Sequence, residues 1–205
     1  MKFAIMGTGG TGGCLGGYLA LAGNDVTFIA RGKHLAAIRE KGLMIRTNHR
    51  GDISITNATA CTMEEYDDVP DVLFVCVKYY SLPDAVTFAR RVAGCDTLVI
   101  PILNVYGTGG VMQKELPGVT CLDGCIYVMA QVEAPGIIAQ PQKILRVFYG
   151  FRPGPERRLE EKARELERFL NAAEIAGRFT ENIRRDALQK FAFVSPMGAA
   201  GLYYD

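Results

Sequence analysis

Apolar residues along the first hundred positions recur in short runs separated by amphipathic stretches. Lys2–Met6 is apolar after its first residue, and Val72–Val77 is apolar throughout. A strand covered on both faces by helices has this continuous apolar character, while the stretches between the runs carry apolar residues at helical spacing. The pattern predicts, in chain order, a strand at Lys2–Met6, a helix at Thr11–Ala22, a strand at Asp25–Ala30, a helix at Lys33–Lys41 closed by Gly42, a hairpin of Leu43–Thr47 and Ile53–Ile55, a strand at Val72–Val77, a helix at Ser81–Ala93 and a strand at Thr97–Ile100.

From residue 119 onward the chain changes to β-rich segments interrupted by Gly and Pro. They predict strands at Val119–Cys121, Ile126–Val132, Gly136–Ala139 and Ile144–Phe148, which we interpret as the far edge of the same sheet. A charged amphipathic helix at Pro155–Ala173 and an extended piece at Glu174–Arg178 follow. Asn182 then begins an apolar helical pattern with no expected partner within the chain. Because such a helix normally buries its apolar face, we expect an all-helical domain to begin near residue 181 and to be cut short here, with a homodimer through this helix as one consequence.

Composition narrows the class of protein. The 205 residues are 49% hydrophobic and 22% charged with a net charge of +1, which fits a globular protein and gives no electrostatic footprint for nucleic acid. No run predicts a membrane span or a secretory signal, and six cysteines without a CxxC pair indicate reduced, cytoplasmic core residues. The two histidines, His34 and His49, have no ligand partners at suitable spacing, so we expect no metal site.

A glycine-rich run joins the first predicted strand to the first predicted helix. Its residues, Gly7, Thr8, Gly9, Gly10, Thr11 and Gly12, form a GxGxxG motif. In such a motif the first glycine permits the tight turn, the second lets the backbone approach a pyrophosphate, and the third allows the helix to pack closely on the strand. The helix N-terminus then offers free N–H groups to the phosphates. The alternative is a glycine-rich turn without a ligand, but the strand before it and the helix after it favour a dinucleotide site.

The residue after the second predicted strand indicates which dinucleotide binds. An NAD-specific site has a carboxylate there for the ribose 2′-hydroxyl, whereas this chain has Arg31, with Lys33 nearby. A guanidinium suits a 2′-phosphate, so we expect NADP(H) as the cofactor. The alternative is that Arg31 is an ordinary solvated arginine. Residues 1–180 are therefore interpreted as an NADP-binding α/β domain with a Rossmann-type doubly wound sheet, and residues 181–205 as the first helix of an incomplete helical domain for substrate binding or dimerisation.

Two further polar residues follow predicted strands of the sheet. Lys78 comes directly after Val72–Val77, and Asn104 follows Leu98–Leu103. Taken singly they are a solvated lysine and a turn former. Both residues lie at the sheet edge where doubly wound folds bind ligands, and this shared location makes them candidate ligand-binding residues.

Several segments together resemble the ketopantoate reductases, or 2-dehydropantoate 2-reductases. The resemblance covers essentially the whole chain and rests on the opening strand and glycine loop at residues 2–13, the segment Asp25–Gly32 followed by His34-Leu35, the pair Val77-Lys78, the segment Asn104–Gly107, and Asn182–Asp186 leading to Lys190-Phe191. The glycine loop alone fits many dehydrogenases. The Ala30-Arg31-Gly32 continuation and the helix carrying Lys190 are much more specific.

The resemblance implies NADPH-dependent reduction of 2-dehydropantoate to pantoate in pantothenate synthesis. It implies that Lys190 is the proton donor to the ketone and contacts the substrate together with Asn104. It further implies that Lys78 and Asn104 contact the cofactor, that Arg31 binds the 2′-phosphate, and that Ala130 lines the nicotinamide pocket. A ketone that accepts a hydride becomes an alkoxide, which a cationic donor such as an ammonium stabilises and protonates.

The chain departs from the family pattern beyond the lysine. Members of the best-known type have asparagines four and eight residues later to hold the substrate, whereas this chain has Val194 and Gly198. A different 2-keto acid therefore stays open as the substrate. A third interpretation is a non-catalytic protein that binds NADP(H) and senses its redox state.

Overall fold

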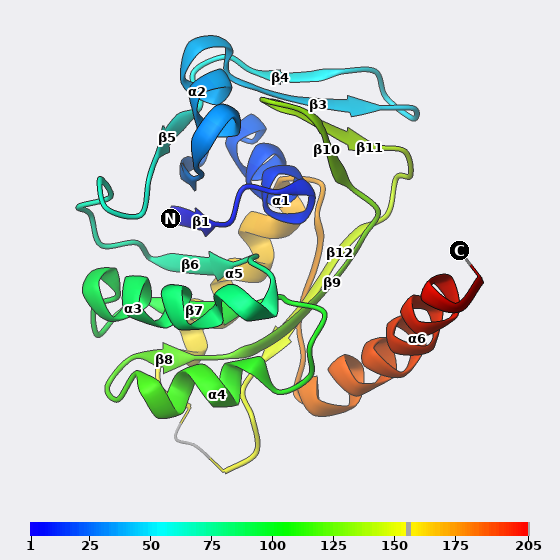
Figure 1. Cartoon of the computed structure of the whole chain (residues 1–205). Coiled ribbons are helices and arrows are strands. Elements are labelled where there is room, and N and C mark those ends of the chain that lie inside the picture. Colours follow the sequence, from blue (N-terminus) through cyan, green and yellow to red (C-terminus); the bar gives the residue numbers. More distant parts are fainter. Residues whose placement is uncertain (155–156, 205) are drawn as a thin grey trace.

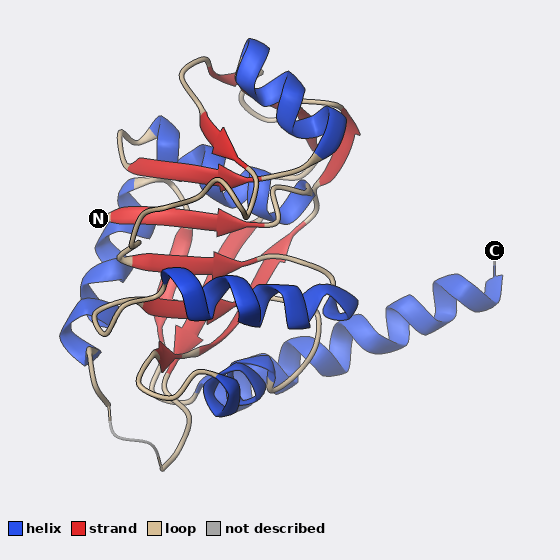
Figure 2. Cartoon of the chain, turned by 60° about the vertical axis from the view of Figure 1, so that its left-hand side comes forward, coloured by secondary structure: helices blue, strands red, loops and turns tan. Residues whose placement is uncertain are grey.

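A six-stranded parallel sheet forms the centre of the computed structural model, which describes residues 1–154 and 157–204. Its strand order is β5-β2-β1-β6-β7-β8, and every neighbouring pair is parallel. This order begins in the middle, proceeds to one edge and returns to the other, as in doubly wound dinucleotide-binding domains. The strands, seen side by side in Figure 2, are β1 Lys2–Met6, β2 Asp25–Ile29, β5 Thr59–Cys61, β6 Val72–Val75, β7 Leu98–Pro101 and β8 Thr120–Cys121.

Helices cover both faces of this sheet, which explains why its central strands are apolar throughout. Alternate residues of a strand point to opposite faces, and in β1 Phe3 and Ile5 belong to one buried cluster while Ala4 and Met6 belong to the other. The first cluster includes side chains of α1 (Gly10–Leu21) and α5 (Glu160–Ala172), and the second includes side chains of α3 (Leu82–Val92) and α4 (Thr108–Glu115).

Helix α1 lies between the parallel sheet and a smaller one, and its glycines make this possible. A Cβ added at Gly16 would lie 2.6 Å from the Phe28 ring, and one at Gly13 would lie 2.9 Å from Ile138 Cγ1. These contacts are on opposite sheets, so neither side of the helix has room for a larger residue. The smaller sheet has the order β10-β11-β3-β4, made of β10 Gln131–Ala134, β11 Ile137–Gln140, β3 Leu43–Thr47 and β4 Ile53–Ile55.

The later strands do not form the far edge of the main sheet, so that expectation is wrong apart from β8. β9 (Asp123–Val128), β12 (Leu145–Gly150) and β13 (Ala176–Phe179) form a third sheet, and β11 joins the β3–β4 hairpin that was predicted. The expected strand Ile126–Val132 is divided between β9 and β10. Strand β5, helix α4 and the short helix at Tyr79–Ser81 were not expected, while α2 (Gly32–Lys41) was.

The C-terminal helix α6 (Ile183–Tyr204) has a partner within the chain, contrary to expectation. Its first half packs against β9 and β12, and both Ile183 and Lys190 are buried there. Its second half projects from the body of the molecule, as Figures 1 and 2 both show. The expected helix start at Pro155 lies outside the described residues. None of the described helices is long and apolar enough to cross a membrane.

Candidate functional site

The glycine-rich loop lies at the carboxyl end of β1, next to the point where the strand order reverses between β1 and β6. Gly7 has φ +94°, a conformation that favours glycine. Its N–H and that of Thr8 both donate to the carbonyl oxygen of Ile29 at 3.2 Å, and the buried Thr8 hydroxyl donates to the same atom at 3.0 Å. The loop is thereby fixed to the end of β2, and α1 begins directly behind it.

The space around each glycine tests whether a diphosphate fits here. A Cβ added at Gly9 would meet nothing within 4 Å, so the backbone is open where the motif needs a close approach. A Cβ at Gly12 would lie 3.0 Å from Ile5 and from Cys76 Cβ, as expected for close packing of helix on strand. The N–H groups of the first turn of α1 have no acceptor within the helix. The loop therefore fits a diphosphate group.

Ala130 meets this loop through its backbone. A Cβ at Gly10 would lie 2.5 Å from the carbonyl carbon of Ala130 and 2.7 Å from Cα of Gln131. The connection between β9 and β10 thus crosses over the start of α1. The structure places Ala130 beside the phosphate loop, while its expected place at the nicotinamide pocket stays a prediction.

Arg31 and Lys78 have exposed side chains at the same edge of the sheet. Arg31 precedes the first turn of α2, and Lys78 precedes the short helix Tyr79–Ser81. The residues that follow β2 are Ala30 and Arg31, so no carboxylate stands where an NAD-specific site has one. Both cations are free to approach an anion at this edge.

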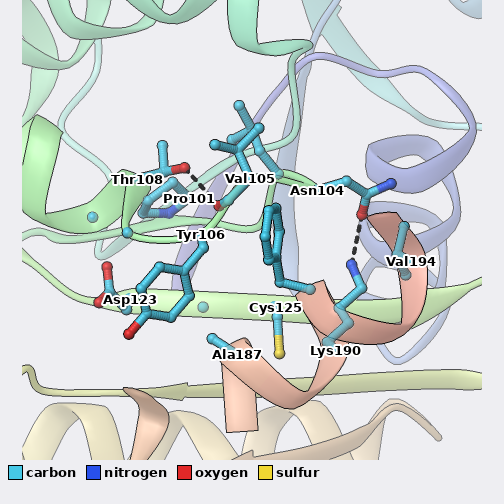
Figure 3. A pocket seen from close by; sticks show the side chains of 15 residues that line it. Pro101, Asn104, Val105, Tyr106, Thr108, Asp123, Cys125, Ala187, Lys190 and Val194 are labelled. Carbon is cyan, nitrogen blue, oxygen red and sulfur yellow. Dashed lines mark hydrogen bonds between the residues drawn. The ribbon is translucent and has the colours of Figure 1, made fainter. Parts of the chain in front are cut away.

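A hollow opens beyond β7, between the loop after β7, β9 and α6 (Figure 3). It brings Lys190 and Asn104 together, 86 residues apart in sequence. Lys190 Nζ donates to Asn104 Oδ1 at 2.6 Å and lies 5.9 Å from the centroid of the Tyr127 ring. The hollow is lined by Pro101, Leu103–Gly109, Asp123–Cys125, Ala187, Lys190, Phe191 and Val194.

The Lys190 ammonium is unusually placed for a lysine, because the residue is only 5% exposed. Burial lowers the pKa of Lys190 from its ordinary value. Burial also raises the pKa of the neighbouring Cys125 thiol to about 11, so the thiol stays neutral near pH 7. Lys190 is therefore a cation with a proton that is easier to release than that of a solvated lysine.

The start of α6 explains how Lys190 is held in position. Asn182 Oδ1 accepts from the N–H of Arg185 at 3.1 Å, which caps the helix. The Thr180 hydroxyl donates to Asp186 Oδ2 at 2.6 Å, one turn before Lys190. Asn182 was expected to begin this helix. The pairing with Asn104 could not be derived from spacing.

Sequence reasoning gave no site role to Tyr127, whose ring lies near Lys190, or to His34. Nothing in the pattern distinguishes Tyr127 from a core aromatic. His34 Nδ1 accepts from the N–H of Gly136 at 3.0 Å, which ties the first turn of α2 to the β10–β11 turn. Burial lowers the pKa of His34. Among the described residues no group of three or more His, Cys, Asp or Glu could hold a metal ion.

The parallel sheet, its strand order and the glycine loop at the reversal point define a Rossmann-type dinucleotide-binding domain. A family model described as ketopantoate reductase PanE/ApbA matches residues 3–151. The chain is 32% identical over 183 residues to the 2-dehydropantoate 2-reductase of Pyrococcus abyssi, a match that covers 89% of this chain and 57% of that protein. It is 27% identical over 195 residues to the uncharacterized oxidoreductase YkpB of Bacillus subtilis, covering 95% and 62%.

The fold of this chain also matches solved structures. The 2-dehydropantoate 2-reductase of Porphyromonas gingivalis W83 superposes with a TM-score of 0.87 at 30% identity, covering all of this chain and 72% of that chain. A D-mandelate dehydrogenase solved with NADH and anilino(oxo)acetate shares the fold, with a TM-score of 0.81 at 24% identity over 93% of this chain and 60% of that chain. This chain belongs to the ketopantoate reductase family of oxidoreductases. It spans about three fifths of the length of the two curated relatives.

Proposed function

We propose that this protein reduces a 2-oxo acid with NADPH, with 2-dehydropantoate as the first substrate to test and pantoate as its product, as in pantothenate synthesis. The observation that carries the proposal is the buried Lys190 ammonium on Asn104, in an open hollow of a dinucleotide-binding fold. The six free cysteine thiols are consistent with a protein that acts in the cytoplasm.

The residues that would hold the cofactor are the loop Gly7–Gly12 for the diphosphate and Arg31 for the 2′-phosphate. Lys78, Asn104 and Ala130 are assigned to the remainder of the cofactor. When bound, NADPH supplies the hydride for the ketone carbon. The choice of NADPH over NADH rests on Arg31 alone, because its guanidinium suits a phosphate and no carboxylate replaces it.

Lys190 would complete the reaction as the proton donor. As negative charge develops on the carbonyl oxygen, the ammonium stabilises it and transfers one proton, which leaves a neutral amine and a 2-hydroxy acid. The amine then takes a proton back from water. Asn104 Oδ1 accepts a hydrogen bond from Nζ and so orients one N–H, leaving the others for the substrate. The lowered pKa favours this transfer near neutral pH.

The test is NADPH oxidation, followed at 340 nm, with 2-dehydropantoate and other 2-oxo acids. Lys190→Ala should abolish turnover while NADPH affinity is kept. Lys114→Ala, an exposed lysine on α4, is the matched control and should change neither quantity. Unchanged turnover in Lys190→Ala would remove the proton-donor role. Tight NADPH binding without oxidation of any 2-oxo acid would select the alternative of a redox-sensing protein.

A further inference from the structure

Val194 lies in the hollow one helical turn beyond Lys190. Residues four apart on a helix share a face, and both side chains line the hollow. Of residues 191–203, Val194 alone is not exposed. Figure 3 places its side chain beside the Lys190 ammonium and Asn104. When Lys190 donates a proton to the carbonyl oxygen of a substrate, the substituent on the carbonyl carbon would therefore contact Val194.

The rest of the wall near Lys190 is apolar too. Val105, Tyr106 and Phe191 line the hollow, and the rings of Tyr106 and Phe191 are 6.4 Å apart at 48°. In Figure 3 the Tyr106 hydroxyl points away from Lys190. Apart from Lys190, Asn104 and the weakly donating Cys125 thiol, this part of the wall offers a substrate no side-chain hydrogen bond.

Two further polar side chains of the hollow, Thr108 and Asp123, already have partners. The Thr108 hydroxyl donates to the Val105 carbonyl at 2.9 Å. The Asp123 carboxylate pairs with Arg152 at 3.4 Å. The Thr108 proton and one Asp123 oxygen are thus already engaged, and a buried hydroxyl without a partner is unfavourable.

We infer that this hollow selects a 2-oxo acid whose substituent is wholly apolar, and that Val194 is the residue that disfavours a hydroxyl on it. The inference rests on the proposed reduction of a 2-oxo acid and names its substrate class. An apolar pocket rejects an added hydroxyl by up to roughly 100-fold. We therefore expect a preference of about 10- to 100-fold for a substrate without the hydroxyl.

A matched pair of 2-oxo acids tests this directly. 2-Dehydropantoate and 3,3-dimethyl-2-oxobutanoate have the same carbon skeleton around the ketone and differ by one hydroxyl. The measurements are kcat/KM with NADPH, and equilibrium binding of each acid by calorimetry to the chain with and without NADP+. The variants are Val194→Asn, which supplies an amide at the hollow, and Val194→Thr, which keeps the volume. Ala192→Asn is the control, because this exposed position does not line the hollow.

The expected result is a ratio of at least about 10 in favour of 3,3-dimethyl-2-oxobutanoate, which falls or reverses in both Val194 variants and is unchanged in Ala192→Asn. A ratio near 1, a preference for 2-dehydropantoate in the unsubstituted chain, or an unchanged ratio in the Val194 variants overturns the inference. Absence of binding by both acids also overturns it. If both acids bind but neither oxidises NADPH, the proposed reaction fails, and the binding ratio alone decides the inference.

Discussion

Replacing Gly9 by alanine tests the diphosphate site without disturbing the fold. Gly9 has φ −80° and ψ −162°, which alanine adopts without strain, and an added Cβ meets nothing within 4 Å. Exposed substitutions of this kind usually change the free energy of unfolding by less than about 0.5 kcal/mol. The added methyl instead occupies the space that a phosphate group needs to reach the loop.

The expected loss of affinity follows from the hydrogen bonds that the methyl prevents. A hydrogen bond to a charged group contributes about 1.5–3 kcal/mol, and about 1.4 kcal/mol corresponds to a tenfold change in Kd. Loss of one such bond weakens NADPH binding by about 10- to 100-fold. Because the diphosphate is common to both cofactors, NADH binding should weaken by the same factor.

Gly10→Ala is the contrasting variant. Its Cβ would lie 2.5 Å from the Ala130 carbonyl carbon, so the backbone must move. Overpacking costs typically about 1–3 kcal/mol, and we expect a lower Tm for Gly10→Ala but not for Gly9→Ala. Thermal unfolding and NADPH titration of both variants give the comparison. Undiminished NADPH affinity in Gly9→Ala would refute the assignment of this loop to the diphosphate.

Four further predictions follow from the same contacts. Arg31→Ala should weaken NADPH binding by about 10-fold or more and leave NADH binding unchanged, by titration of each cofactor; equal effects on both would leave Arg31 as a solvated side chain. Turnover should be present at low pH and fall as pH rises through the pKa of Lys190, which burial lowers, because only the ammonium can donate the proton; a pH–rate profile without that fall would contradict the role. Tyr149→Phe should lower the free energy of unfolding by about 1 kcal/mol in urea titration, because the buried hydroxyl loses its 2.9 Å bond to the Ala163 carbonyl. The exposed apolar side chains of α6 should give a dimer in sedimentation, and a clean monomer at high concentration would count against it.

The sequence predicts a helix or strand well where the apolar pattern of that segment alone determines which of its faces are buried. Lys2–Met6 and Leu43–Thr47 are strands with the bounds expected, and the apolar run at Val72 ends two residues early, at Val75. Strand partners were harder to predict, because β11 and β12 follow one another in the chain yet join different sheets. Pairing depends on contacts distant in sequence, such as those that place Ile138 on Gly13.

The same distinction applies to the site. The glycine loop carries its own conformational requirements, so its six residues could be located from sequence. Lys190 could be singled out only through the family resemblance, since its burial and its bond to Asn104 depend on how α6 packs against β9. The apolar α6 pattern was read as unpartnered because nothing local indicates that its first half covers a sheet.

The segment from Cys125 to Ala130 explains how the two halves of the site are held in fixed relation. Cys125 lines the hollow and the Tyr127 ring faces Lys190, while the Ala130 backbone rests against Gly10 at the phosphate loop. Five residues of extended chain span about 16 Å. Strand β12 pairs with β9 along its whole length, so this stretch is rigid up to Val128. A displacement of Ala130 by a Cβ at Gly10 should therefore also shift the hollow. In Gly10→Ala we expect kcat to be lower than in the unsubstituted chain even when NADPH is saturating.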